Sequence, residues 1–485
     1  MPEMEVLDGG PAPVLEHLHL ADLLLGAARR RPCNGISSID EAGGSRRRSY
    51  AEQLTVSSRI ARELRAAGQR SGDRVMLPDM PNWALIDAFW GCQLADAVPV
   101  VLPAGAQVAP GYHSLVVTGA DLSVVQPERG RPEAPHEPFD GAEGAAVVCF
   151  TAGGGGRRRP ITLTHHQVLS RTVATCEHNG WDDSERTYNC MPLRHVSGLL
   201  MFHVRDVYLG AEQIHELPQA ILSDPGLLFE RLRHTRASLS WISPPVLRSL
   251  ATRLSSPATP AGCARLANPA TLRTLMVGGD RIASSDVAII ERQAALSPGV
   301  IVAGYGLTEA GSGIVSAPGA APSSKPVMPV GHPEPGSAVR VIPHAGNEFG
   351  DIEVSSPSCG GVHWLRTGDV GFIDADGLTV LGSKADIFQA QARPYHASEL
   401  EESLRGLPWQ HPDQLVACPV REDLGKVVLY VSASDLDGEA ARAVSGFLHE
   451  VAGLELAQIK RLPPTGIPRA AHGKPLRALL AQSTS

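Results

Sequence analysis

Gly72-Asp73-Arg74-Val75-Met76-Leu77 opens the stretch that decides the fold, as a turn followed by a buried strand. The pattern then predicts a helix over residues 83–95 and a second apolar strand over residues 98–102. The order of a strand, a helix and a second strand is typical of parallel α/β layers. A further strand is expected over residues 145–150, directly before a run of glycines.

The segments on either side of this unit extend the α/β pattern. Alternating apolar and charged residues predict amphipathic helices over residues 14–30 and 49–68. Residues 316–336 are rich in Pro, Gly and Ala, and they predict a connection to a smaller β-rich region that runs to about Leu381.

The pattern changes again after Gly382. Residues 398–404 and 439–451 predict helices, and residues 427–432 predict a strand between them. We therefore expect a large N-terminal domain, residues 1–382, made of layered α/β sheets plus a β-rich subdomain. Residues 383–485 are expected to form a small, mobile α+β domain.

Composition narrows the class of protein. The chain has 485 residues, is 43% hydrophobic and carries a formal net charge of −8, which suits a large enzyme and not a nucleic-acid-binding protein. Its 8 cysteines have no zinc-ligand spacing, so we expect free thiols in a reducing compartment. No apolar run is long enough to span a bilayer, and the first residues do not resemble a secretory signal. We expect a cytoplasmic protein with no membrane or nucleic-acid partner.

Several short motifs whose residues could take part in binding or catalysis follow one another along the chain. Taken alone, each is typical of an ordinary turn, a buried histidine or a surface segment. Their order carries the information. The motifs are Pro192-Leu193-Arg194-His195, Gly278-Gly279-Asp280, Gly304-Tyr305-Gly306-Leu307-Thr308-Glu309, Arg366-Thr367-Gly368-Asp369 and Gly473-Lys474.

In this order, the motifs resemble those of the superfamily of acyl-CoA synthetases, nonribosomal-peptide adenylation domains and luciferases. The resemblance implies an active site between the two domains that binds the AMP moiety of an acyl-adenylate. It implies that Asp369 accepts hydrogen bonds from the ribose, that Glu309 helps to hold Mg²⁺ and that Lys474 reaches the acyl carboxylate and the α-phosphate. The other implied site residues are His195 at the acyl pocket, Gly278, Gly279 and Asp280 beside the nucleotide, and Tyr305, Gly306, Leu307 and Thr308 along the adenine and phosphate.

The expected phosphate loop departs from the family pattern. Residues 151–159 fit neither a Walker A nor a Rossmann fingerprint. Thr151, Gly153 and Gly156 match the superfamily loop, and the pair Thr164-His165 follows at the matching distance. One serine and two threonines of the family are Ala152, Gly154 and Gly155, and the lysine is Arg159. Each lost hydroxyl removes a phosphate contact of about 1.5–3 kcal/mol, which the arginines offset only in part.

The expected hinge between the domains is also altered. The family has Gly-Arg and then a charged hinge residue, whereas this chain has Gly382-Ser383 and then Lys384-Ala385-Asp386. Ala385 is the simplest assignment of the hinge position, and a shift of one residue would make it Lys384 or Asp386. A changed hinge affects the rotation that separates the two half-reactions of the family.

These features lead to one expectation and three alternatives. We expect a ligase that forms an acyl-CoA thioester and works mainly in the thioesterification half-reaction, with acyl-AMP supplied by a separate adenylating enzyme. The alternatives are a complete synthetase that uses ATP and Mg²⁺, a ligase that loads a carrier-protein pantetheine arm instead of CoA, and a non-catalytic adenylate-binding relic. The acid itself is expected to be a small molecule.

Overall fold

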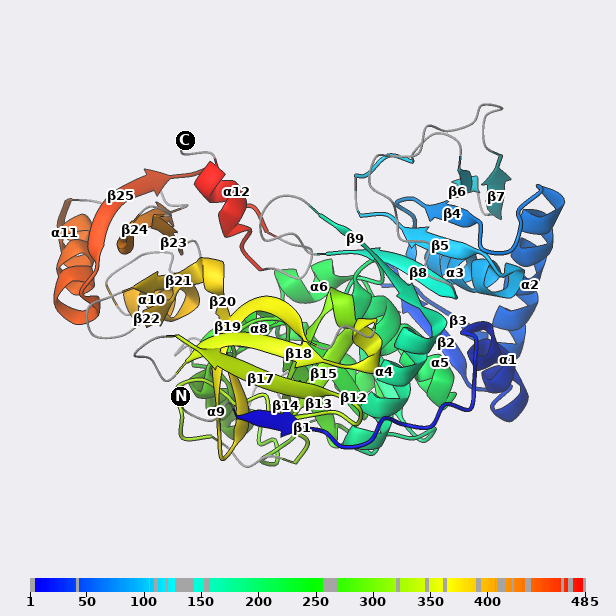
Figure 1. The fold of residues 1–485 in the computed structure, drawn as a ribbon, viewed down its shortest axis with the longest axis horizontal. Coiled ribbons are helices and arrows are strands. Elements are labelled where there is room, and N and C mark those ends of the chain that lie inside the picture. The colour runs from blue at the N-terminus through cyan, green and yellow to red at the C-terminus, as the bar shows by residue number, and fades with distance from the viewer. Residues whose placement is uncertain are drawn as a thin grey trace.

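The computed structural model of the protein forms, among the residues that it describes, four β-sheets of three or more strands, and it places the segment after residue 383 to one side of the rest (Figure 1). It describes residues 5–40, 43–103, 105–108, 112–118, 121–126, 144–151, 158–255, 269–319, 323–344, 349–360, 364–389, 394–405, 407, 415–420, 423–431, 438–463, 466–469 and 474–482.

The stretch that opened the sequence analysis lies in a 6-stranded sheet of order β7-β6-β4-β5-β8-β9. Its central strands β6, β4, β5 and β8 are parallel, as the pattern predicted. The two edge strands run antiparallel to their neighbours. The strands are β4 Arg74–Leu77, β5 Val98–Val101, β6 His113–Thr118, β7 Asp121–Val125, β8 Ala145–Phe150 and β9 Pro160–Thr164.

Two predicted helices pack beside this sheet (Figure 1). Helix α2, Tyr50–Ala66, begins at a capping box in which Ser49 and Glu52 satisfy each other's backbone N–H groups. Helix α3, Asn82–Ala95, is buried over most of its length. Helix α1, Ala21–Arg30, is shorter than predicted. The expectation of a helix from residue 14 was wrong, because the Leu20 backbone N–H donates to His165 Nδ1 and the chain before it stays extended or bent.

The second layer is a 9-stranded sheet of order β16-β15-β14-β13-β12-β10-β11-β2-β3. Its strands from β14 to β2 are parallel, and the strands at its two ends are antiparallel. The strands are β2 Gly35–Ile39, β3 Ser45–Ser49, β10 Arg186–Asn189, β11 Glu212–Glu216, β12 Leu239–Ile242, β13 Thr274–Gly278, β14 Ile301–Leu307, β15 Ser312–Ser316 and β16 His332–Pro333.

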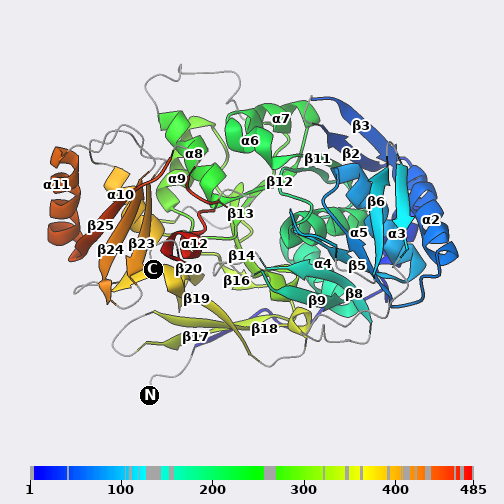
Figure 2. The ribbon, with the colours of Figure 1, turned by 90° about the horizontal axis from the view of Figure 1, so that it is seen from above.

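Helices fill the space between the two sheets and cover the outer face of the larger one (Figure 2). The π-helical segment η1, Ser197–Val204, links the two sheets. Its Leu199, Leu200 and Val204 join the core of the 6-stranded sheet, whereas Met201 and Phe202 join the core of the 9-stranded sheet. The remaining helices of this part are α4 His165–Asn179, α5 Arg205–Leu209, α6 Pro218–Ser223, α7 Leu227–Thr235, α8 Pro244–Ser255 and α9 Ser284–Gln293.

The β-rich subdomain is a 5-stranded antiparallel sheet of order β1-β17-β18-β19-β20. It packs its apolar residues into the same core as one face of the larger sheet. The first of its strands comes from the N-terminus, which the sequence pattern did not predict. The strands are β1 Val6–Asp8, β17 Ala338–Pro343, β18 Gly350–Ser355, β19 Leu365–Asp374 and β20 Gly377–Ser383.

The C-terminal segment has a hydrophobic cluster of its own, which extends from Phe388 to Leu454. Its 3-stranded sheet pairs β23 antiparallel and β25 parallel to β24. The predicted domain boundary after Gly382 stays a prediction, since strand β20 continues through Ser383. The elements are β21 Ile387–Gln389, β22 Pro394–His396, α10 Ala397–Arg405, β23 Leu415–Val420, β24 Asp423–Val431, α11 Gly438–Phe447, η7 Leu448–Ala452, β25 Glu455–Arg461 and α12 Arg477–Gln482.

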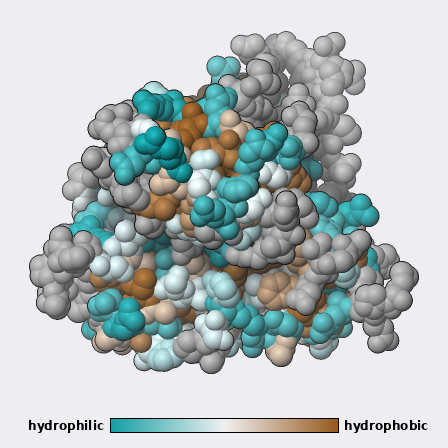
Figure 3. Space-filling view, turned by 90° about the vertical axis from the view of Figure 1, so that its left-hand side faces the viewer, coloured by the Kyte–Doolittle hydropathy of each residue, from teal (hydrophilic) through white to brown (hydrophobic). Residues whose placement is uncertain are grey.

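The surface at the C-terminal end of the molecule is a mosaic of hydrophilic and hydrophobic residues (Figure 3). Within the described residues, we find no helix with the length and apolar character that crossing a membrane requires. Most of the described cysteines are buried as free thiols, and Cys33 is exposed.

Candidate active site

The site is built where the central strands of the larger sheet end. Strands β13 and β14 are parallel, and Gly278 pairs with Gly304 at their carboxyl ends. In open α/β sheets, ligands bind at this edge. A Cβ atom on Gly278 would lie 2.6 Å from the Gly304 carbonyl oxygen, so glycine is required for the two strands to close up. Gly279 and Asp280 follow directly, and Tyr305 follows Gly304.

Tyr305 and Asp369 form the first of three polar pairs in the site. The Tyr305 hydroxyl donates to Asp369 Oδ2 at 2.8 Å, and it joins strand β14 to strand β19. Burial raises the pKa of Tyr305 well above its usual value, so the hydroxyl keeps its proton. Burial also raises the pKa of Asp369, although the hydrogen bond from Tyr305 opposes this effect. A carboxylate held in this way can accept hydrogen bonds from neighbouring hydroxyl groups.

Glu309 and Arg159 form the second pair. Glu309 lies in a short turn, Thr308–Ala310, that follows strand β14, and Thr308 is buried. The Arg159 guanidinium donates to Glu309 Oε1 at 3.0 Å across 150 positions of the chain. Arg159 also closes the base of the glycine loop, because its backbone N–H donates to Thr151 Oγ1 at 3.0 Å. Gly153, with the rest of residues 152–157, lies outside the described residues.

The sequence reasoning anticipated phosphate contacts for the arginines and missed the contact with Glu309. The pairing matters for the expected metal ion. Mg²⁺ is held by one or two carboxylates together with substrate phosphates. A guanidinium on Glu309 Oε1 places positive charge where the cation would bind, so Mg²⁺ would have to displace this contact. The role of Glu309 as a metal ligand stays a prediction.

Lys474 and Asp280 form the third pair, which joins the C-terminal segment to the large sheet. Lys474 Nζ lies 3.2 Å from Asp280 Oδ2. Burial alone would raise the pKa of Asp280, but nearby positive charge, above all that of Lys474, lowers it below its usual value. Burial would lower the pKa of Lys474, but Asp280, Asp386 and Asp369 raise it. The two side chains therefore stay charged, and an ammonium group stands beside the edge of the sheet.

His195 lies two residues before the start of η1. Its Nδ1 accepts the Ser197 backbone N–H at 3.3 Å and lies 3.0 Å from the Ser197 hydroxyl. Burial lowers the pKa of His195 to about 4. The ring is therefore neutral near pH 7, with its proton on Nε2. Gly306 and Leu307 pair with Gly313 and Ser312 of the antiparallel strand β15, and they shape the turn that carries Thr308.

The predicted hinge turn is anchored at both ends. Lys384 Nζ lies 2.9 Å from Asp351 of strand β18, and Asp386 lies 3.3 Å from Arg477. Ala385 lies between these two ion pairs. Arg477 is nearly buried, and it also donates to Glu401 at 2.7 Å, so it ties α12 to α10. Arg477 stands three residues after Lys474, and the sequence analysis did not single it out.

A cavity of about 330 Å³ opens between the large sheet and the C-terminal segment. Helix α8 forms one wall, and α10 and the segment around Arg469 form another. Asp280 lies in its lining, so the cavity reaches the Lys474–Asp280 pair. Its volume is within the range of pockets for small molecules, and its lining combines arginines from both sides with the carboxylates of Asp280 and Glu401. The cationic residues are Arg248, Arg281, Arg469 and Arg477.

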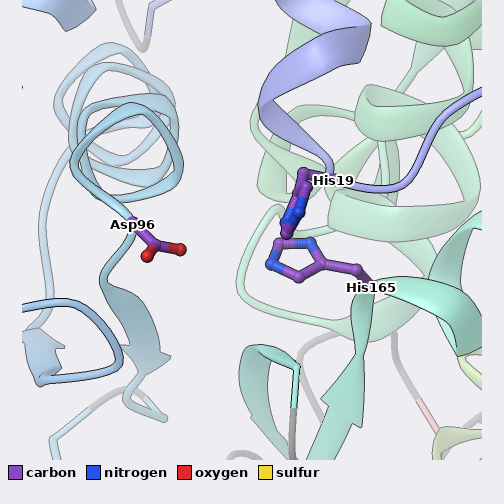
Figure 4. Close-up of side chains that lie close together, drawn as sticks. All are labelled: His19, Asp96 and His165. Atoms are coloured by element: carbon purple, nitrogen blue, oxygen red, sulfur yellow. The ribbon is translucent and has the colours of Figure 1, made fainter.

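His165, of the predicted Thr164-His165 pair, does not join the site. Thr164 caps helix α4 through a capping box with Gln167. Figure 4 shows His165 beside His19, with Asp96 facing them, and atoms of the three lie within 4.8 Å of one another. The Leu20 N–H donates to His165 Nδ1, and burial lowers the pKa of the ring to about 4, so the proton lies on Nε2. Metal-binding histidines need a free lone pair, so this cluster does not fit a metal ion.

The chain is similar to several known proteins. The chain is 26% identical over 474 residues to a feruloyl-CoA synthase of Amycolatopsis sp, an alignment that covers 88% of this chain and 93% of that protein. It is 25% identical over 517 residues to an atromentin synthetase of Paxillus involutus, covering 92% of this chain and 54% of the relative. The chain thus spans about half the length of the atromentin synthetases that it matches.

Among solved structures, the fold resembles that of McyG A-PCP complexed with phenylalanyl-adenylate. The TM-score is 0.80 at 20% identity, with 99% of this chain and 84% of that one covered. A family model described as AMP-binding enzyme matches residues 107–361, which is more than half of the chain and includes the motifs around Asp280 and Glu309. The protein belongs to the AMP-binding enzyme family.

Proposed function

We propose that the protein is an acid–thiol ligase that uses an acyl-adenylate and works mainly in the step that transfers the acyl group to a thiol. The observation that carries the proposal is the contrast between the three polar pairs. Tyr305–Asp369 and Lys474–Asp280 keep the groups that an acyl-adenylate requires. In the third pair, Arg159 occupies the carboxylate of Glu309, which the metal and the triphosphate tail would require.

Each residue has a stated part in the proposed reaction. Asp369 accepts hydrogen bonds from the ribose and positions the adenylate. The thiolate attacks the acyl carbonyl carbon, the bond to the AMP oxygen breaks, and AMP leaves with its phosphate negative. Lys474 is the cation that stabilises negative charge on the carbonyl and phosphate oxygens. The arginines that line the cavity beside Asp280 support an entry route for a thiol on a phosphorylated carrier, such as CoA.

The test compares two reaction mixtures. The first contains a carboxylic acid, ATP, Mg²⁺ and CoA, and the second contains the matching acyl-AMP and CoA. Acetyl, benzoyl and feruloyl groups make a suitable panel, the last because of the feruloyl-CoA synthase relative. We expect thioester in the second mixture and little pyrophosphate in the first. Rapid pyrophosphate release in the first mixture would overturn the proposal and favour a complete ATP-dependent synthetase. The retained Lys474 and Glu309 are the residues that support this alternative.

Asp369→Asn is the matched control for binding of the adenylate. It keeps the size of the side chain and removes the charge that accepts the ribose hydroxyls. A charged hydrogen bond contributes about 1.5–3 kcal/mol, so kcat/KM with acyl-AMP should fall by about 10-fold to 100-fold. An unchanged rate would contradict the role given to Asp369, and no thioester from any acyl-AMP would favour the non-catalytic relic. Replacing CoA by a carrier protein with a pantetheine arm decides between the two acceptors.

A further inference from the structure

A small buried cavity lies between helix α4, strand β15 and the residue that follows strand β16. Its volume is about 10 Å³, and its wall includes Ser170, Arg171 and Ala174 from α4, Ile314 from β15, and Glu334. All five residues are at most 5% exposed. A cavity of roughly 10–15 Å³ is large enough for one water molecule, provided that two to four polar groups surround it.

Two charged residues of this wall each have one polar atom without a partner in the described part of the chain. These atoms are Arg171 Nε and Glu334 Oε1. The other polar atoms of both side chains are paired. Arg171 donates through Nη1 to Met201 Sδ at 2.8 Å and through Nη2 to the Leu200 carbonyl at 2.7 Å, and Glu334 Oε2 accepts the Thr175 hydroxyl at 2.6 Å. One donor and one acceptor therefore remain on two residues that line the same cavity.

The fold holds these two side chains near each other without direct contact. Arg171 and Thr175 are four residues apart, so they share one face of α4, with Cβ atoms about 5–6 Å apart. Thr175 binds one carboxyl oxygen of Glu334, and the charge of Arg171 opposes the rise in pKa that burial causes in the same carboxyl group. Among the described residues, no hydrogen bond joins Arg171 Nε to Glu334 Oε1. A bridging water is nearly as favourable in enthalpy as a direct hydrogen bond across such a gap.

The wall of the cavity favours water over an ion. A cation would meet the guanidinium of Arg171, and an anion would meet the carboxyl group of Glu334. Water accepts from Arg171, and it either donates to Glu334 or accepts from it. Serine hydroxyls complete the polar wall, since Ser337 donates to Ser356 at 3.0 Å and Ser356 lies 2.9 Å from Ser358. The cavity therefore offers water the number of partners that it requires.

Arg171 also packs against the turn that carries Glu309. Gly311 ends the turn Thr308–Ala310 in the left-handed conformation, with a φ of +70°. A Cβ atom on Gly311 would lie 3.9 Å from both Cδ and Nε of Arg171. The nitrogen that lacks a protein partner is thus beside the end of the turn. Because protein interiors are closely packed, a shift of this guanidinium displaces the turn.

We propose that this cavity binds one water molecule, which joins Arg171 Nε to Glu334 Oε1, and that the water-mediated pair holds the turn Thr308–Ala310 in place. The inference goes beyond the proposed function, because it requires neither an adenylate nor a thiol. Arg171 and Glu334 are positioning residues that act through the turn. Loss of the water leaves two buried polar atoms unpaired, so the turn should open more often.

A crystal structure of the wild-type protein, at a resolution that shows ordered waters, tests the binding site. We expect one water within about 3.2 Å of both Arg171 Nε and Glu334 Oε1. A direct contact between the two side chains, or a cavity without electron density, would overturn the inference. Crystals soaked in bromide distinguish water from an anion, and an anomalous signal inside the cavity would equally overturn it.

Hydrogen–deuterium exchange tests the effect on the turn. Ala174→Val adds two methyl groups at the wall and keeps both charged residues, so it should expel the water. We expect amide exchange in residues 308–311 to become at least about 5-fold faster, while exchange in strand β4 stays unchanged. If the cavity is dry, the added methyl groups fill it and exchange in the turn slows or stays the same, which contradicts the inference.

Two further variants separate the water from the charge. Arg171→Met keeps the length of the side chain, removes Nε and should accelerate exchange in residues 308–311 as Ala174→Val does. Acceleration in Arg171→Met alone would mean that the guanidinium acts without the water, and the inference would fail. Arg31→Met, at an exposed arginine that pairs with Asp183, is the matched control and should leave exchange in the turn unchanged. If a variant does not fold, the wild-type crystal structure still decides whether the water is bound.

Discussion

Glu334 provides a test of the electrostatics of the fold that is independent of catalysis. It follows strand β16 and is 1% exposed, between α4 and strand β15. Its Oε2 accepts the Thr175 hydroxyl at 2.6 Å, and within the described residues its Oε1 has no partner. Burial raises the pKa of Glu334 from 4.5 to about 7, although Thr175 and the positive charge of Arg171 oppose this effect. The folded protein therefore binds a proton here that the unfolded chain releases at lower pH.

The sign and size of the effect follow from this difference. Between pH 4.5 and about 7, the folded state holds more protons than the unfolded state, so the free energy of unfolding falls as the pH rises. The loss is complete above the folded pKa. A shift of roughly 2.5 units corresponds to about 3 kcal/mol. Glu334→Gln cannot titrate and escapes this loss, so its stability relative to the wild type should increase by about 3 kcal/mol over this pH range.

Two assays measure the effect. Urea unfolding of both proteins at a series of pH values from 4.5 to 8 gives the difference in the free energy of unfolding for the transition that includes the N-terminal part. Infrared difference spectra between pH 6 and pH 8 report the carboxylic acid band directly, and the variant should lack that component. Glu455→Gln, at an exposed carboxylate, shows the effect of removing one negative charge. If wild type and Glu334→Gln give parallel stability curves and identical infrared spectra, the reasoning on burial is refuted.

Two further predictions concern the site. Arg159→Ala frees the carboxylate of Glu309, so pyrophosphate release from acid and Mg-ATP should rise by up to about 5-fold. The melting temperature should stay nearly constant, because the pair is exposed on the arginine side and contributes only about 0–1 kcal/mol to stability. A lower rate of pyrophosphate release would mean that Arg159 assists ATP binding. Gly382→Ala should destabilise the contact between the two parts by about 1–3 kcal/mol, because its φ is +129° and the new Cβ would lie 2.1 Å from His396 Nε2. His396→Ala should restore part of this loss in a double-mutant cycle of unfolding free energies, and strict additivity would contradict the steric explanation.

Local patterns in the sequence determined the elements whose stability comes from neighbouring residues. Helix α2 was predicted from an amphipathic run, and the structure adds a capping box at its start. Strand β8 was predicted with its observed bounds from six residues that include a continuous apolar run. The parallel layers followed from the alternation of strands and helices. Helix α1 was predicted too long, since its start is set by the tertiary hydrogen bond from Leu20 to His165.

The features of the site also divide into those that the sequence predicted and those that only the tertiary structure decided. The order of the motifs predicted Tyr305, Asp369 and Lys474 as neighbours of an adenylate, because residues of these types can carry that chemistry wherever the fold brings them together, and this role stays a prediction. The partners of these groups were decided by the tertiary structure alone. Arg159 contacts Glu309 across 150 positions, and Glu334 accepts its hydrogen bond from Thr175 of helix α4. Such contacts depend on sheet order and on the removal of water around a side chain, and a linear pattern does not record either of them.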